Sequence, residues 1–427
     1  MGPEAPQAAP IAPHLPGLAI ELRYGLSHLG KVMLWHSLEV YALFYLTDIA
    51  GIDARLAGIV FMAMLAIDAV ANLTVGVVFD SLKIARRPSS CVLVLTPALI
   101  LLFVLSFAGQ AVAAPWAWSI LFMQLTRLLF VMVDVPHNAV LLRLVAQGQS
   151  DTRLATLRHA AGLGGILLVG GLSLVLAGRT LDGGSFQLLI WSIAALAGGL
   201  LLLTPKTVAE AGQVQSSPAP RPKAGDTAGL VRNRFVLLVL ALGLIVYTGN
   251  SLVAHSLPFA AKLMADNAKL TGQILLALTV VKVLATPITW FGIRRTSEIT
   301  TGLVVTALFG TAGLCLASGT GAMTSWLALL FAIGLADTAM TIVGWTLVMR
   351  AHASLLRSGT DRPATLTALF TSMGRLGSGL SGLILSSILA LPSAAFTGHL
   401  GIAIAVCSLA ALMVLLALAK AQPRLLA

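Results

Sequence analysis

The sequence predicts an all-α membrane protein with twelve transmembrane helices arranged as two six-helix halves. Of its 427 residues, 58% are hydrophobic and 10% are charged, whereas soluble domains carry about 25% charged residues. Apolar runs recur along the whole chain, and about 20 apolar residues suffice to cross the hydrocarbon core of a bilayer. A soluble fold could not bury this much apolar surface, because single cores stop growing at about 250–300 residues. The lipid bilayer is therefore the expected partner of most of the surface.

The apolar runs fall into two sets of six predicted spans. The first set lies at residues 25–47, 56–79, 90–112, 116–143, 156–178 and 186–204. The second set lies at residues 235–262, 269–292, 300–318, 324–349, 364–390 and 398–419. Two of the runs, Cys91–Ala108 and Phe186–Thr204, contain no charged residue, as is typical of helices that face lipid.

One long polar segment divides the chain between these two sets. Residues 205–233 are rich in Ser, Pro, Gly and basic residues, a composition that favours a linker. We therefore expect a first half at 18–204 and a second half at 234–427. Residues 1–17 are rich in Pro and Ala and lack a basic start followed by an apolar stretch. This composition predicts a disordered cytoplasmic tail instead of a signal peptide.

The basic residues predict the orientation in the membrane. Lys and Arg gather after the even-numbered spans and in the linker, whereas the loops after spans three, nine and eleven contain none. By the positive-inside rule, both termini are then cytoplasmic, and we expect a bacterial inner membrane and a monomer. The net charge of +11 follows from these short loops and does not indicate nucleic-acid binding.

The main functional signal is a small set of charged and polar side chains inside the predicted spans. A charge at the bilayer centre costs about 2.5–3.5 kcal/mol even on the mildest insertion scale, so such residues form pairs or line a pathway. The first half has most of them: Lys31, His36, Glu39, Asp68, Asn72, Arg127, Asp134, His137, Asn138, Arg158 and His159. The second half is sparser, with Lys282, Asp337 and Arg375.

This set favours a secondary transporter that binds a small-molecule substrate. The sequence contains no Walker motif for ATP, no catalytic triad pattern and no metal-ligand spacing, so we expect neither an enzyme nor a cofactor. Structural roles remain open for several members. Lys31 could snorkel to the interface, Arg158 could pair with Asp68 or Asp134, and an Asp337–Arg375 pair would be neutral.

Several short motifs resemble the glycoside–pentoside–hexuronide:cation symporters, a group of the major facilitator superfamily that includes the melibiose/cation symporter. The motifs are Tyr24-Gly25, Gly30-Lys31, Tyr45-x-Thr47-Asp48-x-x-Gly51, the stripe Asp68, Gly76 and Asp80, the triplet Asp134-Val135-Pro136, Arg158, and Met373-Gly374-Arg375-Leu376-Gly377. The resemblance covers most of the first half and a shorter stretch of the second.

The resemblance implies the major facilitator fold and alternating access around a site near the midplane. For this chain it implies cation or proton coupling at Asp68, Asn72 and Asp134. The expected substrate-binding residues are Lys31, Trp35, Glu39, Asn138, Arg158 and Arg375. A gating role falls on Gly76, Asp80, Arg86 and Arg87, at and after the end of span two.

Departures from the family pattern modify this expectation. Val32 and Asn72 stand where the family has acids, and Asn138 stands where melibiose-type symporters have an aromatic residue. The lost acids favour H⁺ over Na⁺ as the coupling ion. We expect symport of a small polar solute, with a sugar or glycoside as the leading substrate class. The alternative is a proton-linked transporter or exporter of a non-sugar metabolite, lipid or amphiphilic drug, and a third reading is a non-transporting receptor.

Overall fold

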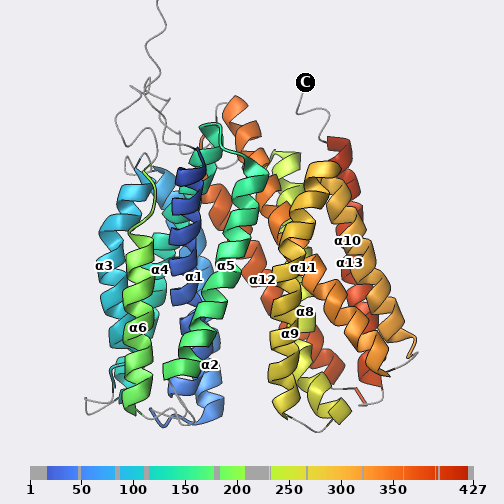
Figure 1. Ribbon diagram of the computed structural model, residues 1–427, viewed down its shortest axis with the longest axis horizontal. Coiled ribbons are helices and arrows are strands. Elements are labelled where there is room, and N and C mark those ends of the chain that lie inside the picture. Colours follow the sequence, from blue (N-terminus) through green and yellow to red (C-terminus); the bar gives the residue numbers. More distant parts are fainter. Residues whose placement is uncertain are drawn as a thin grey trace, which may run out of the picture.

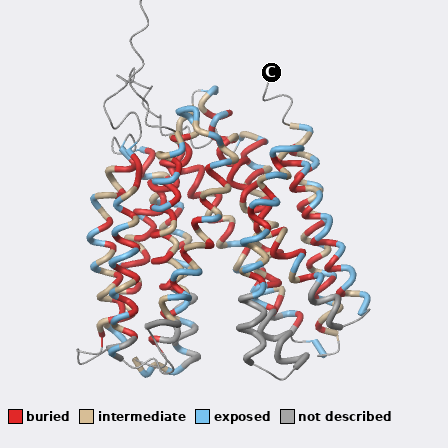
Figure 2. Tube along the Cα trace, viewed as in Figure 1, coloured by how far each residue is buried: buried red, intermediate tan, exposed pale blue. Residues whose placement is uncertain are grey.

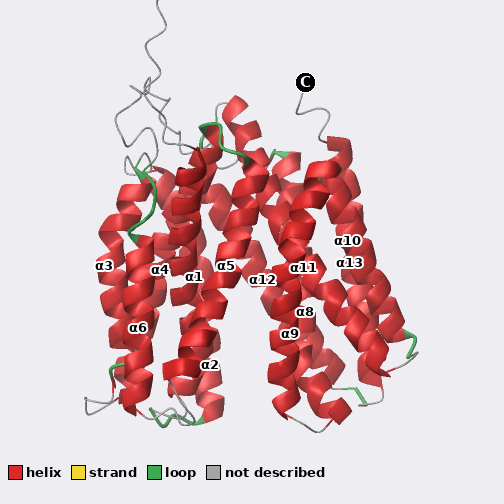
Figure 3. Ribbon diagram, in the orientation of Figure 1, coloured by secondary structure: helices red, strands yellow, loops and turns green. Residues whose placement is uncertain are grey.

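The computed structural model describes residues 17–46, 50–81, 87–109, 115–176, 183–206, 230, 232–265, 268–319, 322–358, 360–389, 391–392 and 395–421. Within these ranges the regular structure is entirely helical (Figure 3). The predicted tail before Gly17, most of the predicted linker and Arg86 lie outside the described residues.

Twelve helices form the two halves, and the all-α prediction is confirmed (Figure 1). The first half contains α1 (Gly17–Phe44), α2 (Ala54–Ser81), α3 (Pro88–Ser106), α4 (Pro115–Ala146), α5 (Asp151–Leu176) and α6 (Gly183–Leu201). The second half contains α8 (Arg234–Ala265), α9 (Ala268–Arg295), α10 (Glu298–Ala317), α11 (Ala322–Arg357), α12 (Pro363–Leu389) and α13 (Phe396–Ala421). Within the described residues, nine helices are long and apolar enough to cross a membrane.

Several helices are longer than the apolar runs that predicted them. Helix α1 begins at Gly17 instead of residue 25, and α11 continues to Arg357 instead of residue 349. The added turns are more polar than the membrane-spanning windows, because a helix continues past the hydrocarbon wherever its ends find polar partners. Helix starts follow local rules: Pro88 occupies the first turn of α3, and Ser297 accepts a hydrogen bond from the Thr300 N–H at the start of α10.

The two halves meet at one side of the bundle and diverge toward the other. They approach each other on the side where α1 begins and α13 ends, at the top of Figure 1, which we call the closed side. The opposite side, where the two sets of backbones separate, we call the far side. Figure 2 shows buried residues concentrated where the halves meet. The sequence predicts that the closed side is cytoplasmic.

An apolar core crosses between the halves on the closed side. It joins Tyr24, Leu141 and Leu154 of the first half to Val239 and Val348 of the second, all of them at most 2% exposed. A second core lies within the first half and is built around the aromatic rings of Tyr45, just after α1, Phe107, just after α3, and Phe186 on α6. Burial of apolar surface therefore stabilises the contact between the halves as well as the interior of each half.

Helix α2 contacts the start of α12 directly. The Asp80 carboxylate accepts hydrogen bonds from the backbone N–H groups of Ala364 at 3.2 Å and Thr365 at 2.6 Å. These first-turn N–H groups have no partner within their own helix, so an acid of one half caps a helix of the other. The hydroxyl of Thr365 also donates to the Gly76 carbonyl at 3.2 Å.

Two ion pairs on the closed side link the halves reciprocally. Arg143, in the last turn of the fourth helix of the first half, lies 2.6 Å from Asp361, just before the fifth helix of the second half. Arg350, near the end of the fourth helix of the second half, lies 3.0 Å from Asp151, at the start of the fifth helix of the first. This exchange of matching positions is the pattern of two structural repeats, which sequence similarity between the halves did not reveal.

Asp361 stays ionised in this arrangement. Burial alone would raise the pKa of its carboxyl group, but the hydrogen bond from His352 and the charge of Arg143 outweigh burial and lower that pKa. The Arg143–Asp361 pair therefore persists at neutral and mildly acidic pH and does not act as a proton sensor.

The approach of α2 to α12 requires glycine at position 76. A Cβ atom added to Gly76 would lie 2.4 Å from the Ala368 Cβ, whereas a Cβ added to Gly199 on α6 meets no protein atom within 4 Å. Gly76→Ala should destabilise the protein by about 1–3 kcal/mol through overpacking. Gly199→Ala should be neutral or stabilising by up to about 1 kcal/mol, since alanine favours the helix.

Thermal unfolding of the two purified variants in one detergent measures this difference. Labelling of a cysteine introduced on the closed side should also accelerate in Gly76→Ala, because the contact between the halves is weakened. Equal melting temperatures for the two variants would contradict the close approach.

Candidate substrate and coupling site

The charged residues predicted inside the spans form three networks along the interface between the halves. We name them by position. The middle network contains Lys31, Asp134, Asn138 and Arg158. The outer network, nearer the far side, contains Glu39, Asp68 and Arg127. The second-half network contains Asn250, Lys282 and Asp337.

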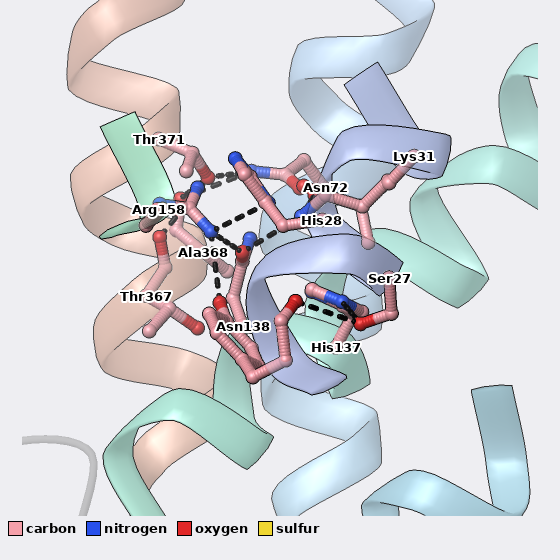
Figure 4. A network of polar contacts seen from close by, with 12 residues as sticks. Ser27, His28, Lys31, Asn72, His137, Asn138, Arg158, Thr367, Ala368 and Thr371 are labelled. Atoms are coloured by element: carbon pink, nitrogen blue, oxygen red, sulfur yellow. Dashed lines mark hydrogen bonds and ion pairs between the residues drawn. The ribbon is translucent and has the colours of Figure 1, made fainter. Parts of the chain in front are cut away.

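The middle network joins helices α1, α4 and α5 (Figure 4). The Lys31 ammonium donates to the Asp134 carboxylate at 2.6 Å and to the Asn138 amide oxygen at 2.9 Å. Arg158 donates to the same amide oxygen at 2.9 Å. Asp134 and Asn138 share one face of α4 because they are four residues apart. Lys31 is 3% exposed, so its side chain points into the protein and does not snorkel to the interface.

Arg158 connects this network to the second half. Its guanidinium lies over the Trp345 ring of α11, with 3.8 Å between the guanidinium carbon and the ring centroid, a cation–π contact. It also donates to the Tyr24 hydroxyl at 3.0 Å and lies 3.2 Å from His28 Nδ1. Among the described residues, no carboxylate lies within ion-pair distance of Arg158. The pairing of Arg158 with Asp68 or Asp134 that the sequence left open is therefore absent from this conformation.

A stack of aromatic and imidazole rings lies beside Arg158. The Tyr24 ring stacks on those of His28 and His137, and His137 Nε2 lies 2.9 Å from the Ser27 hydroxyl. Sequence analysis missed Tyr24 and His28 as members of the site. The available signal was helical spacing, since positions 24, 28 and 31 share a face of α1.

The outer network shares one guanidinium between two carboxylates. Arg127 Nε donates to Asp68 at 2.6 Å, and Arg127 Nη2 donates to Glu39 at 2.9 Å. Arg127 and Asp68 are buried, whereas the Glu39 side chain is 31% exposed. The sequence grouped Asp68 with Asp134 as one coupling unit and Glu39 with the substrate. The structure instead places Asp68 with Glu39, and Arg127, which the sequence left without a role, holds them together.

Two arginine side chains, one from each half, lie over the Trp35 ring at the boundary between the halves. The guanidinium carbon of Arg127 lies 4.8 Å from the Trp35 ring centroid, and that of Arg375, on α12 of the other half, lies 5.3 Å from it. Phe130 packs against the same ring at 5.0 Å between centroids. The predicted substrate residues Trp35 and Arg375 thus lie together.

In the second-half network, Asp337 is paired with Lys282 and not with Arg375, the partner that the sequence left open. Asp337 accepts from Lys282 at 2.7 Å and from Asn250 at 2.8 Å, so the Asp337–Arg375 pair is wrong. Lys282 on α9 reaches Asp337 on α11 because the two helices pack side by side, which the separation along the chain could not indicate. Both side chains are about a quarter exposed.

The remaining predicted residues lie at the contact between α2 and α12. Gly76 and Asp80 make the contacts described above. Asn72, expected among the coupling residues, donates across the interface to the Ala368 carbonyl at 3.0 Å and the Thr371 hydroxyl at 2.7 Å. Arg87 is exposed and immediately precedes α3. In this conformation the Asn72 side chain therefore connects the two halves through hydrogen bonds.

The buried Lys31–Asp134 pair should be sensitive to loss of either partner. Lys31→Met leaves the Asp134 carboxylate uncompensated, and breaking a buried pair in this way costs about 3–5 kcal/mol. The double variant Lys31→Met/Asp134→Leu removes both charges and should recover most of that loss. Arg143→Met, at the partly exposed pair with Asp361, should cost only about 0–1 kcal/mol. Unfolding of the four purified proteins tests this order, and a double variant less stable than Lys31→Met would contradict it.

Comparison with known proteins agrees with this architecture. FucP in the outward conformation, from the major facilitator superfamily, superposes with a TM-score of 0.74 at 14% identity over 95% of this chain and 98% of that one. The proton:xylose symporter XylE superposes with a TM-score of 0.65 at 12% identity over 95% of each chain. At these identities the likeness shows the fold alone.

Sequence comparison also finds an uncharacterized symporter of Synechocystis sp., 27% identical over 157 residues. The match covers 35% of this chain, and this chain spans only 29% of the length of that relative. Residues 23–420 match the family described as MFS/sugar transport protein. The chain is therefore an integral, multi-pass membrane protein, and it belongs to the MFS/sugar transport protein family.

Proposed function

We propose that the protein is a proton-coupled symporter of a small polar solute of the sugar or glycoside class, working by alternating access. The observation that carries the proposal is the outer network, in which one guanidinium is shared by two carboxylates. The family supports sugar transport in general, and the arrangement of charges supports the choice of ion.

The outer network can bind one proton on one of its two carboxylates. Glu39, Asp68 and Arg127 together carry a net charge of −1 when all three are ionised. Protonation of one carboxylate leaves a neutral one-to-one pair, and two carboxylates close together favour such shared protonation. Glu39 is the partly exposed member, so we assign it the exchange of the proton with water.

A proton suits this network better than Na⁺. Sodium requires several oxygen ligands at once, but the Asp68 carboxylate is already bound by Arg127 at 2.6 Å. A bound sodium ion would have to displace a buried guanidinium, whereas a proton needs only one carboxylate oxygen. Asp134 is likewise held by Lys31. We propose that it responds to substrate through Asn138, whose amide oxygen accepts hydrogen bonds from both Lys31 and Arg158.

The alternation of access follows from the contacts between the halves. On the closed side, Asp80, Asn72 and the reciprocal ion pairs join the halves. Opening that side would break these hydrogen bonds while the halves rock about the central networks. We place the closed side in the cytoplasm of a bacterial cell with the protein in the inner membrane, as the distribution of basic residues predicts.

Uptake by proteoliposomes under an imposed pH gradient tests the coupling. The probe is the radiolabelled sugar that gives the largest thermal shift in a panel of pentoses, hexoses and disaccharides. Glu39→Gln and Asp68→Asn should each reduce gradient-driven accumulation at least tenfold, because the shared proton site is lost, while exchange without a gradient continues. Asp53→Asn, an exposed acid that caps the start of α2, is the matched control and should retain accumulation.

Two outcomes would overturn the assignment. Accumulation that follows a Na⁺ gradient and ignores the pH gradient would reject the proton. Full accumulation by both Glu39→Gln and Asp68→Asn would remove the outer network from the coupling mechanism.

A further inference from the structure

We infer that Gln124 on α4 is a positioning residue of the proton site, because its amide accepts a hydrogen bond from Asp68 when that carboxyl group is protonated. The inference rests on the proposed proton coupling. It adds the atom that holds the proton and the neutral side chain that responds to it. It follows from the hydrogen bonds that the outer network closes in this conformation and from those that it leaves open.

The two oxygen atoms of the Asp68 carboxyl group have different surroundings. Oδ2 accepts the hydrogen bond from Arg127 Nε at 2.6 Å, whereas Oδ1 is buried and no hydrogen bond reaches it in this conformation. A proton can therefore bind at Oδ1 without displacing the guanidinium. Burial penalises the charged form of a carboxyl group, and Asp68 is 0% exposed while the Glu39 side chain is 31% exposed. The proton thus enters through Glu39 and rests on Asp68 Oδ1.

A proton at Oδ1 changes what this oxygen needs from its neighbours. The ionised oxygen accepts hydrogen bonds, whereas the protonated oxygen donates one. A side-chain amide can serve both states, because it has an acceptor oxygen and a donor nitrogen. Rotation about the last torsion angle of a glutamine exchanges the two, and that torsion has a broad, roughly two-fold preference.

Gln124 supplies such an amide beside Asp68. It lies three residues before Arg127 on α4, so the two side chains share one helix face, and its amide acts on the Asp68 carboxyl group. Both amide atoms of Gln124 are buried, and neither closes a hydrogen bond in this conformation. Leaving a buried polar group unsatisfied costs about 1–3 kcal/mol, so a hydrogen bond formed on protonation recovers free energy that the ionised arrangement lacks.

The other polar groups around Asp68 cannot change roles in this way. Asn72, one turn further along α2, also has a buried amide oxygen without a hydrogen bond. Its amide nitrogen is held by hydrogen bonds to α12, however, so this amide cannot turn. Arg127 on α4 and Arg375 on α12 both act on the Asp68 charge, but guanidinium groups are donors only. Glu39 on α1 meets the same guanidinium and contributes a second carboxylate.

The position of Gln124 on α4 connects the proton site to the rest of the centre. Helix α4 carries Arg127 of the outer network and Asp134 and Asn138 of the middle network. A hydrogen bond from Asp68 to Gln124 would join α2 to α4 at a second point beside the Arg127 contact. Protonation would therefore add a link to the helix that holds the middle network.

Infrared difference spectroscopy of the purified full-length protein, between acidic and neutral pH, tests this inference. A protonated Asp68 gives a C=O stretching band, identified by its loss in Asp68→Asn, and hydrogen bonding of the carboxyl group lowers its frequency. Gln124→Met keeps the length of the side chain without the amide and should move this band to higher frequency. The matched control is Gln147→Met, which changes an exposed glutamine just after α4 and should leave the band in place.

Transport by the same variants gives a second readout. Gln124→Met should reduce proton-driven accumulation of the radiolabelled sugar about threefold to tenfold, the effect expected for loss of one neutral hydrogen bond. Exchange without a gradient should continue. Gln124→Asn, which keeps the amide on a shorter side chain, should recover part of the loss. A merely structural role for Gln124 would lower the melting temperature without moving the Asp68 band.

The outcomes separate this inference from the proposed function. An Asp68 band that stays in place in Gln124→Met, with proton-driven uptake intact, would overturn the inference and leave the proposed function standing. A spectrum without a band that disappears in Asp68→Asn would also overturn the inference, and accumulation by that variant decides the proposed function separately. Should Gln124→Met not fold, the wild-type band decides, because the frequency of a free carboxyl group would contradict the hydrogen bond.

Discussion

The pairing of buried charges across helices is the constraint on which the rest of this structure depends. A carboxylate inside a membrane protein must find a cation, and here the four central carboxylates find theirs on other helices. Lys31 and Glu39 on α1 are bound to partners on α4, and Asp68 on α2 is bound to Arg127 on α4 as well. The three helices are thus positioned by electrostatics as well as by packing, so a change of protonation would alter how they fit together.

The contact between the halves uses different means on the closed side. An apolar core crosses the interface, Asp80 caps α12 from the opposite half, and reciprocal Arg–Asp pairs lie at the ends of the fourth helices. Most of these contacts are individually modest, since partly exposed ion pairs contribute about 0–1 kcal/mol each. A conformation held by many weak contacts can be opened by ligand binding energy of ordinary size, which is what alternating access requires.

In the proposed mechanism, charge links the coupling site to the substrate site. The outer network has one carboxylate more than its guanidinium neutralises. Arg127 and Arg375 lie over the same Trp35 ring, so a proton on the outer network would change the electric field beside a predicted substrate-binding residue of each half. This proximity offers a physical route for coupling that requires no long-range relay.

The sequence by itself determined the helical membrane fold and the two sets of six helices, because apolar length is a local property. It also predicted candidate site residues from the cost of buried charge. The gating role of Gly76 and Asp80, which the family resemblance implies, stays a prediction. Which charges pair was decided only by the tertiary structure. The sequence grouped Asp68 with Asp134 and considered Asp337 with Arg375, yet packing brought Arg127 to Asp68 and Lys282 to Asp337. Helical periodicity shows which face a side chain occupies, but the helix opposite that face depends on how all twelve helices pack, and no local pattern in the sequence reports that arrangement.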